Sequence, residues 1–148
     1  MNNSRIDGRL QKLVQRESRS LLQYVGDSLP WPSIDDADIT SRLKEIADGE
    51  RRSLAAVMEW LRRHKVPIPY LGPYPEEFTA LNFVSLDYLL WLLVNEEREA
   101  IANLEQDAAA VAEEQARALV DRWLQGKRRH LEQLERLREH SLSAAEVG

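Results

Sequence analysis

The chain has 148 residues, a length typical of one domain with its own core, and 43% of them are hydrophobic while 30% are charged. This composition excludes a disordered chain. The absence of cysteine excludes disulfides, thiol nucleophiles and iron–sulfur clusters, and a net charge of -5 argues against nucleic acid as the main partner. The longest apolar run, Tyr88 to Val94, is too short to cross a membrane, and the chain opens on a charged stretch rather than an apolar signal segment. We expect a cytoplasmic protein with a single domain over residues 1–148.

Two helices are predicted in the first half of the chain. The first spans about Ile6–Val25 and the second runs from about Asp35–Asp38 to His64, with a loop over Gly26–Asp36 between them. Glu17 lies on the apolar stripe of the first helix, and Glu50 on that of the second, with Ser53 beside it. Each stripe therefore carries one carboxylate near its middle.

A long connection is predicted at Val66–Val84. Four prolines and Gly72 exclude a continuous helix there. A connection of this length is unusual in a compact domain, and it suits a crossover that returns the chain along the helices it bypasses.

Two more helices are predicted in the second half of the chain. Ser85 is a good N-cap for a third helix that reaches about Ala110, and a turn near Ala109–Glu114 precedes the fourth. Residues 86–94 are apolar nearly all round, which indicates burial by the other helices, by the crossover or by a second subunit. Lys127 and His130 lie on or beside the stripe of the fourth helix. The core is expected at about residues 6–140, with a flexible tail over residues 141–148.

One short phrase occurs twice, as Gly49-Glu50-Arg51-Arg52-Ser53-Leu54 and as Gly126-Lys127-Arg128-Arg129-His130-Leu131. The positions that differ are three residues apart, so they share one helix face. A glycine inside a helix costs about 1 kcal/mol relative to alanine. Its matched placement in both copies indicates close helix approach beside a polar layer.

The pattern of four helices, a long second connection and one polar residue on each stripe resembles the ferritin-like superfamily, which includes ferritins, bacterioferritins and rubrerythrins. The resemblance covers about Arg9 to His140. Members carry Glu on the first and third helices and Glu-x-x-His on the second and fourth. Glu17 and Glu50 match the first two carboxylates, and His130 matches the last histidine. For the third helix Glu97 matches best, while Glu96 and Val94 stay open as the equivalent position.

Two positions depart from the pattern of the superfamily, because Ser53 stands where a histidine belongs and Lys127 where a carboxylate belongs. The resemblance implies a pair of metal ions, usually iron, between the helices. An ammonium at this place repels metal cations, so we expect no standard di-iron centre and no classical ferroxidase activity.

Two readings of this polar layer follow. In the first, Lys127 is the internal counter-ion of Glu17, Glu50 and Glu97, with His130 beside them, in a metal-free protein. In the second, a single iron or manganese ion is held by Glu50, Glu97 and His130, which would make the protein an oxidase or peroxidase. We predict a degenerate, all-α, four-helix up-down bundle of ferritin-like topology, with the long crossover between its second and third helices. It is metal-free or weakly metal-binding, and dimeric through the surface around Trp91. A helical interaction module is the remaining alternative.

Overall fold

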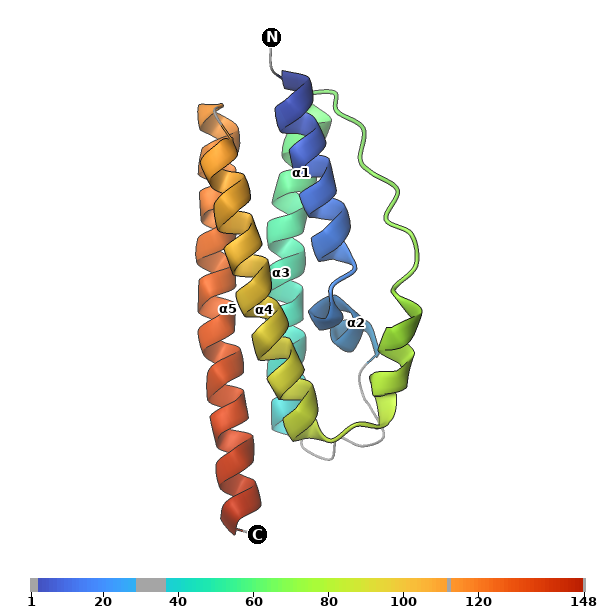
Figure 1. The fold of residues 1–148 in the computed structure, drawn as a ribbon, viewed down its shortest axis with the longest axis vertical. Helices are drawn as coiled ribbons and strands as arrows, with labels where there is room; N and C mark the ends of the chain where they lie inside the picture. Colours follow the sequence, from blue (N-terminus) through green and yellow to red (C-terminus); the bar gives the residue numbers. More distant parts are fainter. Residues whose placement is uncertain (1–2, 29–36, 112, 148) are drawn as a thin grey trace.

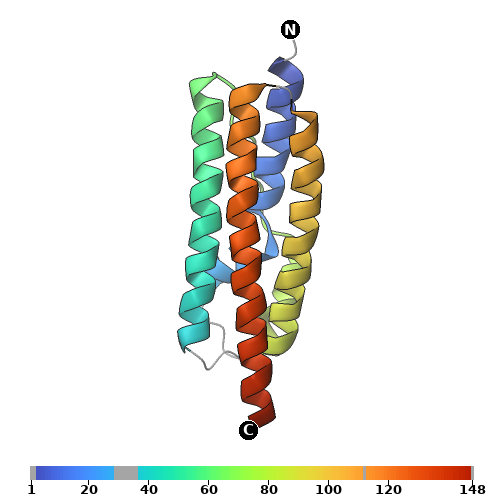
Figure 2. The same cartoon turned by 90° about the vertical axis from the view of Figure 1, so that its left-hand side faces the viewer.

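The regular secondary structure of this protein is helical throughout the part that the structure describes. The computed structural model describes residues 3–28, 37–111 and 113–147. Its elements are α1 (Asn3–Ser18), α2 (Leu21–Ser28), α3 (Ala37–Arg63), the 3-10 helix η1 (Glu76–Phe83), α4 (Leu86–Ala110) and α5 (Glu114–Val147). The prediction of an all-α protein is confirmed. The longer helices α1, α3, α4 and α5 extend along the long axis of the molecule (Figures 1 and 2).

The direction of each helix follows from the path of the chain in Figure 1. There α1 and α5 run downward, whereas α3 and α4 run upward. Residues 64–85 therefore have to return from the top of α3 to the bottom of α4, and the prolines predicted to prevent a continuous helix lie in this connection. Its second half contains η1, a short helix that the sequence analysis did not predict.

The connection is attached to α1 by side chains spaced one helical turn apart. Three of them donate hydrogen bonds to its main-chain carbonyls: Gln11 Nε2 to Pro67 O at 2.5 Å, Gln15 Nε2 to Tyr70 O at 3.2 Å and Arg19 Nε to Gly72 O at 2.5 Å. Gln11 and Gln15 lie on one face of α1 because they are four residues apart, and Arg19 follows just beyond the end of the helix. Together the three side chains hold residues 67–72 of the connection.

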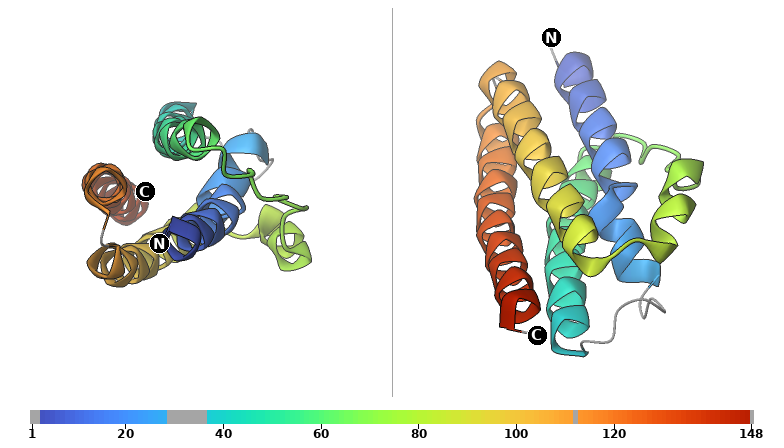
Figure 3. Two further views of the ribbon diagram at one scale, coloured as in Figure 1. Left: turned by 90° about the horizontal axis from the view of Figure 1, so that it is seen from above. Right: turned by 60° about the horizontal axis from the view of Figure 1, so that its bottom comes forward.

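The prediction of one continuous helix over Ile6–Val25 is wrong, because α1 ends at Ser18 and α2 begins at Leu21. Ser20 Oγ accepts a hydrogen bond from the main-chain N–H of Gln23 at 3.2 Å, so it caps the start of α2. The buried Gln23 side chain donates to the carbonyl of Ala47 at 2.8 Å and thereby ties α2 to α3. The break displaces α2 from the axis of α1, as Figures 1 and 3 show.

Most other helix ends agree with the sequence analysis. Ser85 caps α4 by accepting from Tyr88 N at 3.2 Å, and the turn between α4 and α5 lies within the predicted Ala109–Glu114. Two ends differ. The expected loop at Gly26–Asp36 begins later, because α2 continues to Ser28, and residues 29–36 lie outside the described part of the chain. At the other end, α5 continues to Val147 instead of ending near His140.

The buried apolar side chains form two groups, one above the other along the helices. The upper group includes Leu13, Leu54, Ile101 and Leu124, and the lower group includes Leu21, Ile46, Val94 and Leu134. Four buried charged side chains occupy the level between the groups: Glu17, Glu50, Glu97 and Lys127. The apolar core is therefore interrupted by a single polar layer.

Candidate functional site

The polar layer takes one residue from each long helix. Glu17 comes from the last turn of α1, Glu50 from the middle of α3, Glu97 from α4 and Lys127 from α5. Each lies on the apolar stripe of its helix, so the packing that buries the stripes also brings the four charges together. Their exposed fractions are between 3% and 5%.

The ammonium of Lys127 lies at the point where the three carboxylates meet. Its Nζ atom is 3.0 Å from Glu17 Oε2, 3.1 Å from Glu50 Oε1 and 3.0 Å from Glu97 Oε1. An ammonium has three protons to donate, and each of these distances is that of a charge-assisted hydrogen bond. The second oxygen of Glu17 also accepts from Arg16 Nε at 3.3 Å. Lys127 thus uses its full donor capacity on carboxylates from three different helices.

His130 lies beside this layer, one turn beyond Lys127 on α5. Its Nδ1 atom is 3.5 Å from Glu50 Oε2, and neither atom has a hydrogen-bond partner within the described residues. The ring fits against α3 only because residue 49 is glycine, since a Cβ atom there would lie 2.7 Å from His130 Nε2. His130 therefore contacts the carboxylate of Glu50 from the side away from Lys127.

Ser53 does not contribute to the layer. Its hydroxyl bonds back to the carbonyl of Gly49 at 3.4 Å, a local contact within α3. It faces Gly126 of α5, where a Cβ atom would lie 3.6 Å from Ser53 Oγ. The two copies of the repeated phrase therefore pack reciprocally, with the glycine of each copy against the last variable residue of the other.

The pKa of Glu50 and the pKa of Glu97 are shifted in opposite directions. Burial alone would raise the pKa of Glu50, but the ammonium of Lys127 and the adjacent His130 lower it to about 2. For Glu97 burial prevails, and together with the neighbouring Glu50 it raises the pKa well above the usual value. Glu50 is thus the carboxylate that holds its charge most firmly beside Lys127, and Glu97 is the one that takes up a proton more readily as the pH falls.

Lys127 itself remains an ammonium. Burial alone would lower its pKa, but Glu50, Glu97 and Glu17 together raise it above the usual value for lysine. A lysine acts as a nucleophile or a base only when its pKa is lowered. The layer therefore provides a fixed positive charge and no reactive amine.

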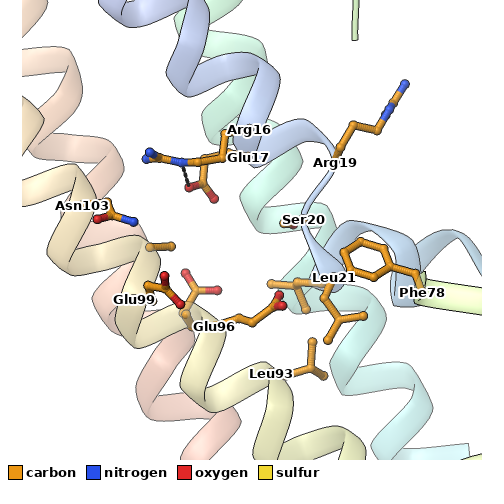
Figure 4. A pocket seen from close by; sticks show the side chains of 13 residues that line it. Arg16, Glu17, Arg19, Ser20, Leu21, Phe78, Leu93, Glu96, Glu99 and Asn103 are labelled. Carbon is orange, nitrogen blue, oxygen red and sulfur yellow. Dashed lines mark hydrogen bonds and ion pairs between the residues drawn. The ribbon is translucent and has the colours of Figure 1, made fainter. Parts of the chain in front are cut away.

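The structure assigns different places to the three residues considered for α4. Glu97 reaches Lys127, Val94 is part of the lower apolar group, and Glu96 points out of the layer. Figure 4 shows Glu96 directed toward Leu21 at the start of α2, whose main-chain N–H donates to its carboxylate. Burial, followed by the nearby Glu99 and Glu17, raises the pKa of Glu96 despite this bond. This contact depends on the helix break between Ser18 and Leu21, which the apolar period of the sequence does not indicate.

A cavity of about 230 Å³ lies beside the layer at the same helix break, between α1, α2 and α4 (Figure 4). Glu17 and Glu97 form part of its wall, together with Arg16 and Glu96. Arg16 was not singled out from the sequence, although its bond to Glu17 makes it the second cation at this end of the layer.

The residues of the layer do not fit a pair of metal ions. Within residues 3–28, 37–111 and 113–147, no group of three or more His, Cys, Asp or Glu side chains is arranged to hold a metal. The carboxylates do converge, but they converge on the Nζ atom of Lys127. A divalent cation at that point would meet an ammonium with a raised pKa, and the two charges would repel.

Comparison of the chain with protein-family models, with curated proteins and with solved structures found no match. No helix in the described part of the chain is long and apolar enough to cross a membrane. An inference about function therefore depends on the chemistry of the layer and of the molecular surface.

Proposed function

We propose that this protein is a degenerate member of the ferritin-like superfamily, a four-helix up-down bundle in which an internal ammonium replaces the di-iron centre. In this proposal α1, α3, α4 and α5 are the four helices, and the connection between α3 and α4 is the long crossover. The observation that carries it is the position of Lys127 Nζ, within 3.1 Å of carboxylates from α1, α3 and α4. Those carboxylates stand on the helices where the superfamily carries its metal ligands.

The protein then acts without oxidation chemistry, as a binding protein whose polar layer fixes how its helices align. A buried ion cluster contributes little net stability, because the desolvation of its charges offsets their attraction. Removing one member is nevertheless costly, since the others are left unpaired. A misaligned helix would break the same contacts, so the layer favours one register over its neighbours. The exposed surface around Trp91 on α4 is the proposed contact for a second copy of the chain.

Metal content tests this proposal against the competing oxidase or peroxidase. The protein is purified after expression in iron- and manganese-replete medium, as wild type and as His130→Ala, and its metals are measured. We expect no stoichiometric metal in either protein, because Lys127 occupies the centre of the carboxylates. Stoichiometric iron or manganese in the wild type that is lost in His130→Ala would overturn the metal-free proposal and support a site of Glu50, Glu97 and His130.

The double variant Lys127→Glu/Ser53→His tests the ferritin-like part of the proposal. It supplies the two groups that the pattern lacks, and the new imidazole at position 53 has space because Gly126 lies opposite it. We expect this variant to bind ferrous or cobaltous ions and to melt at a higher temperature with metal than without. The control Lys127→Met/Ser53→His removes the ammonium without adding the carboxylate and should bind much less. A folded double variant that binds no metal would contradict the assignment.

A further inference from the structure

A large groove lies on the outer side of the molecule between α3 and α5. These two helices lie side by side and antiparallel, as Figures 1 and 2 show. The groove has a volume of about 710 Å³, within the range of small-molecule sites. It is lined mainly by polar side chains, with Arg42, Glu45 and Arg52 on α3 and His130, Arg136 and His140 on α5.

The positive charges of this groove are incompletely neutralised. Arg42 pairs with Asp38 at 3.2 Å, but Arg52 and Arg136 form no ion pair with any residue that the structure describes. Other arginines of these helices vary in this respect: Arg62 pairs with Glu59, Arg98 with Glu135 and Arg128 with Glu105, whereas Arg117 on α5 has no ion pair within the described residues. Two free guanidinium groups therefore face one cavity in a chain whose net charge is -5.

The spacing of the two free arginines favours a ligand with more than one anionic group. Gly49 on α3 lies opposite His130 on α5, so their contact sets the relative height of the two antiparallel helices. Arg52 is three residues from Gly49 toward one end, and Arg136 is six residues from His130 toward the other. At a rise of 1.5 Å per residue, their Cα atoms lie about 13 Å apart along the helix axes.

From these observations we infer that the groove between α3 and α5 binds a small polyanion carrying phosphate or carboxylate groups. The planar guanidinium group offers paired donors that match both kinds of anion. Arg52 and Arg136 would each hold one anionic group, and His140 would supply a further donor near Arg136. This site goes beyond the proposed function, because Arg52, Arg136 and His140 belong neither to the candidate metal site nor to the residues matched to the superfamily.

His130 connects this groove to the buried layer. It lines the groove on one side, and on the other its Nδ1 atom faces Glu50. Glu45 should weaken the binding of an anion, whereas the arginines should strengthen it, because the carboxylate of Glu45 lies in the groove and repels negative charge. The groove thus contains arginines that should strengthen binding and two carboxylates that oppose it, Glu45 and the Asp38 that pairs with Arg42.

Isothermal titration calorimetry at low and at physiological salt tests the inference, with inorganic tripolyphosphate as the phosphate probe and citrate as the carboxylate probe. We expect saturable binding of at least one probe to a single site, with a Kd below about 1 mM. Whichever probe binds more tightly identifies the anion. Arg52→Gln and Arg136→Gln should each weaken binding about tenfold, and Glu45→Gln should strengthen it.

Arg117→Gln is the matched control. Arg117 is an exposed arginine of the same helix as Arg136, it lies outside the groove, and it also has no ion pair within the described residues. The affinity of Arg117→Gln for the probe should stay within about twofold of wild type. This variant has the same change in net charge as Arg52→Gln and Arg136→Gln, but it alters no group of the groove. Absence of saturable heat with both probes would overturn the inference. So would equal losses in Arg117→Gln and Arg52→Gln, because binding would then depend on total charge alone.

Discussion

One ammonium faces three carboxylates, and the carboxylates of the layer differ in their affinity for a proton. Lys127 and His130 lower the pKa of Glu50 to about 2, while burial and the adjacent Glu50 raise the pKa of Glu97. Glu17 has a second cation in Arg16. Two carboxylates of similar burial thus have pKa values shifted in opposite directions, and Glu50 differs in that it faces His130 as well as Lys127.

Substitution of Glu50 and Glu97 by glutamine should therefore have unequal effects. The folded pKa of Glu50 is about 2 against an ordinary 4.5, so its contribution to stability is present above pH 4.5 and is lost as the pH falls toward 2. Glu50→Gln should cost about 3 kcal/mol at neutral pH and progressively less in acid. The measurement is urea unfolding at pH 7 and at pH 3.

Glu97→Gln should cost less stability at pH 7 than Glu50→Gln, because the raised pKa of Glu97 means that its surroundings disfavour the charged carboxylate. The raised pKa of Glu97 stabilises the fold below its ordinary value of 4.5, and this contribution disappears as the pH rises through the folded pKa. The variant should accordingly lose less stability than wild type as the pH rises above 4.5. Equal destabilisation of Glu50→Gln and Glu97→Gln at pH 7 would show that both carboxylates are ionised.

Much of this layer could be predicted from single residues. Glu17 and Glu50 interrupt apolar stripes, and Lys127 occurs in the repeated phrase at the position of Glu50, so periodicity alone places all three inward. The raised pKa of Glu97 could not be predicted, because it depends on distances between residues far apart in the chain. The groove was missed as well, since its arginines lie on the solvent side of helices that looked like ordinary charged faces.

At the scale of elements, the break between α1 and α2 was the main error of the sequence analysis. The apolar period continues from Leu13 through Leu21 to Val25, and this continuity favours one helix. The local signal was present in Ser20-Leu21-Leu22-Gln23, which has the spacing of a capping box. Only the Ser20 half of the box forms, because the Gln23 side chain is used by Ala47 and Arg51 of α3. The contact of Gln23 with α3 is a tertiary interaction, and the local sequence alone does not indicate it.

The end of α5 shows the reverse case, in which local propensity was underestimated. No proline or glycine occurs between Gly126 and Gly148, and Leu142, Ala144, Ala145 and Glu146 are good helix formers. Ser141 also bonds to Asp87 of α4 through its hydroxyl at 2.7 Å. These two features let α5 extend through Val147.

Substitution by alanine should change the stability of the protein in opposite directions at the two glycines of the repeated phrase. At Gly126 the nearest atom to an added Cβ would be Ser53 Oγ at 3.6 Å, an ordinary contact, so Gly126→Ala should gain helix propensity and stabilise by up to about 1 kcal/mol. At Gly49 the added Cβ would lie 2.7 Å from His130 Nε2, and moving the ring disturbs its contact with Glu50. Gly49→Ala should therefore be destabilising.

Thermal melts of the two alanine variants test this difference, and a third variant assigns its cause. In Gly49→Ala/His130→Ala the ring is absent, so the alanine at position 49 should cost much less than it does beside His130. Gly49→Ala as stable as Gly126→Ala would show that the His130 ring moves freely and does not fix the spacing of α3 and α5.

At the scale of the whole molecule, the reciprocal packing of the two phrases relates one half of the chain to the other. Gly49 of α3 receives His130 of α5, and Gly126 of α5 receives Ser53 of α3. Two similar helical halves related by a pseudo-two-fold axis would produce this exchange, and the upper and lower apolar groups lie on either side of it. The two phrases differ at the pairs Glu50/Lys127 and Ser53/His130, which are the positions that the proposed ferritin-like assignment equates with metal ligands.

The outer face of α4 is where we expect the molecule to associate with a second copy. Tyr88 and Trp91 are 47% and 44% exposed, and their rings stack with centroids 5.9 Å apart. Exposed aromatic pairs of this kind are typical anchors of protein interfaces. A stable dimer buries more than about 1,000 Å² in total, so the contact has to extend along α4 on either side of this pair.

Light scattering after size exclusion, at micromolar protein concentration, should give the mass of a dimer for the wild type and of a monomer for Trp91→Glu. The melting temperature of the Trp91→Glu monomer measured at high dilution should be close to that of wild type at the same dilution, since an exposed side chain contributes little to the isolated fold. Tyr70→Ser is the matched control, because Tyr70 is 85% exposed on the connection and far from α4 in sequence. It should remain dimeric. A monomeric wild type, or a dimer that persists in Trp91→Glu, would remove α4 as the interface, whereas loss of the dimer in Trp91→Glu alone would locate the contact at the stacked pair.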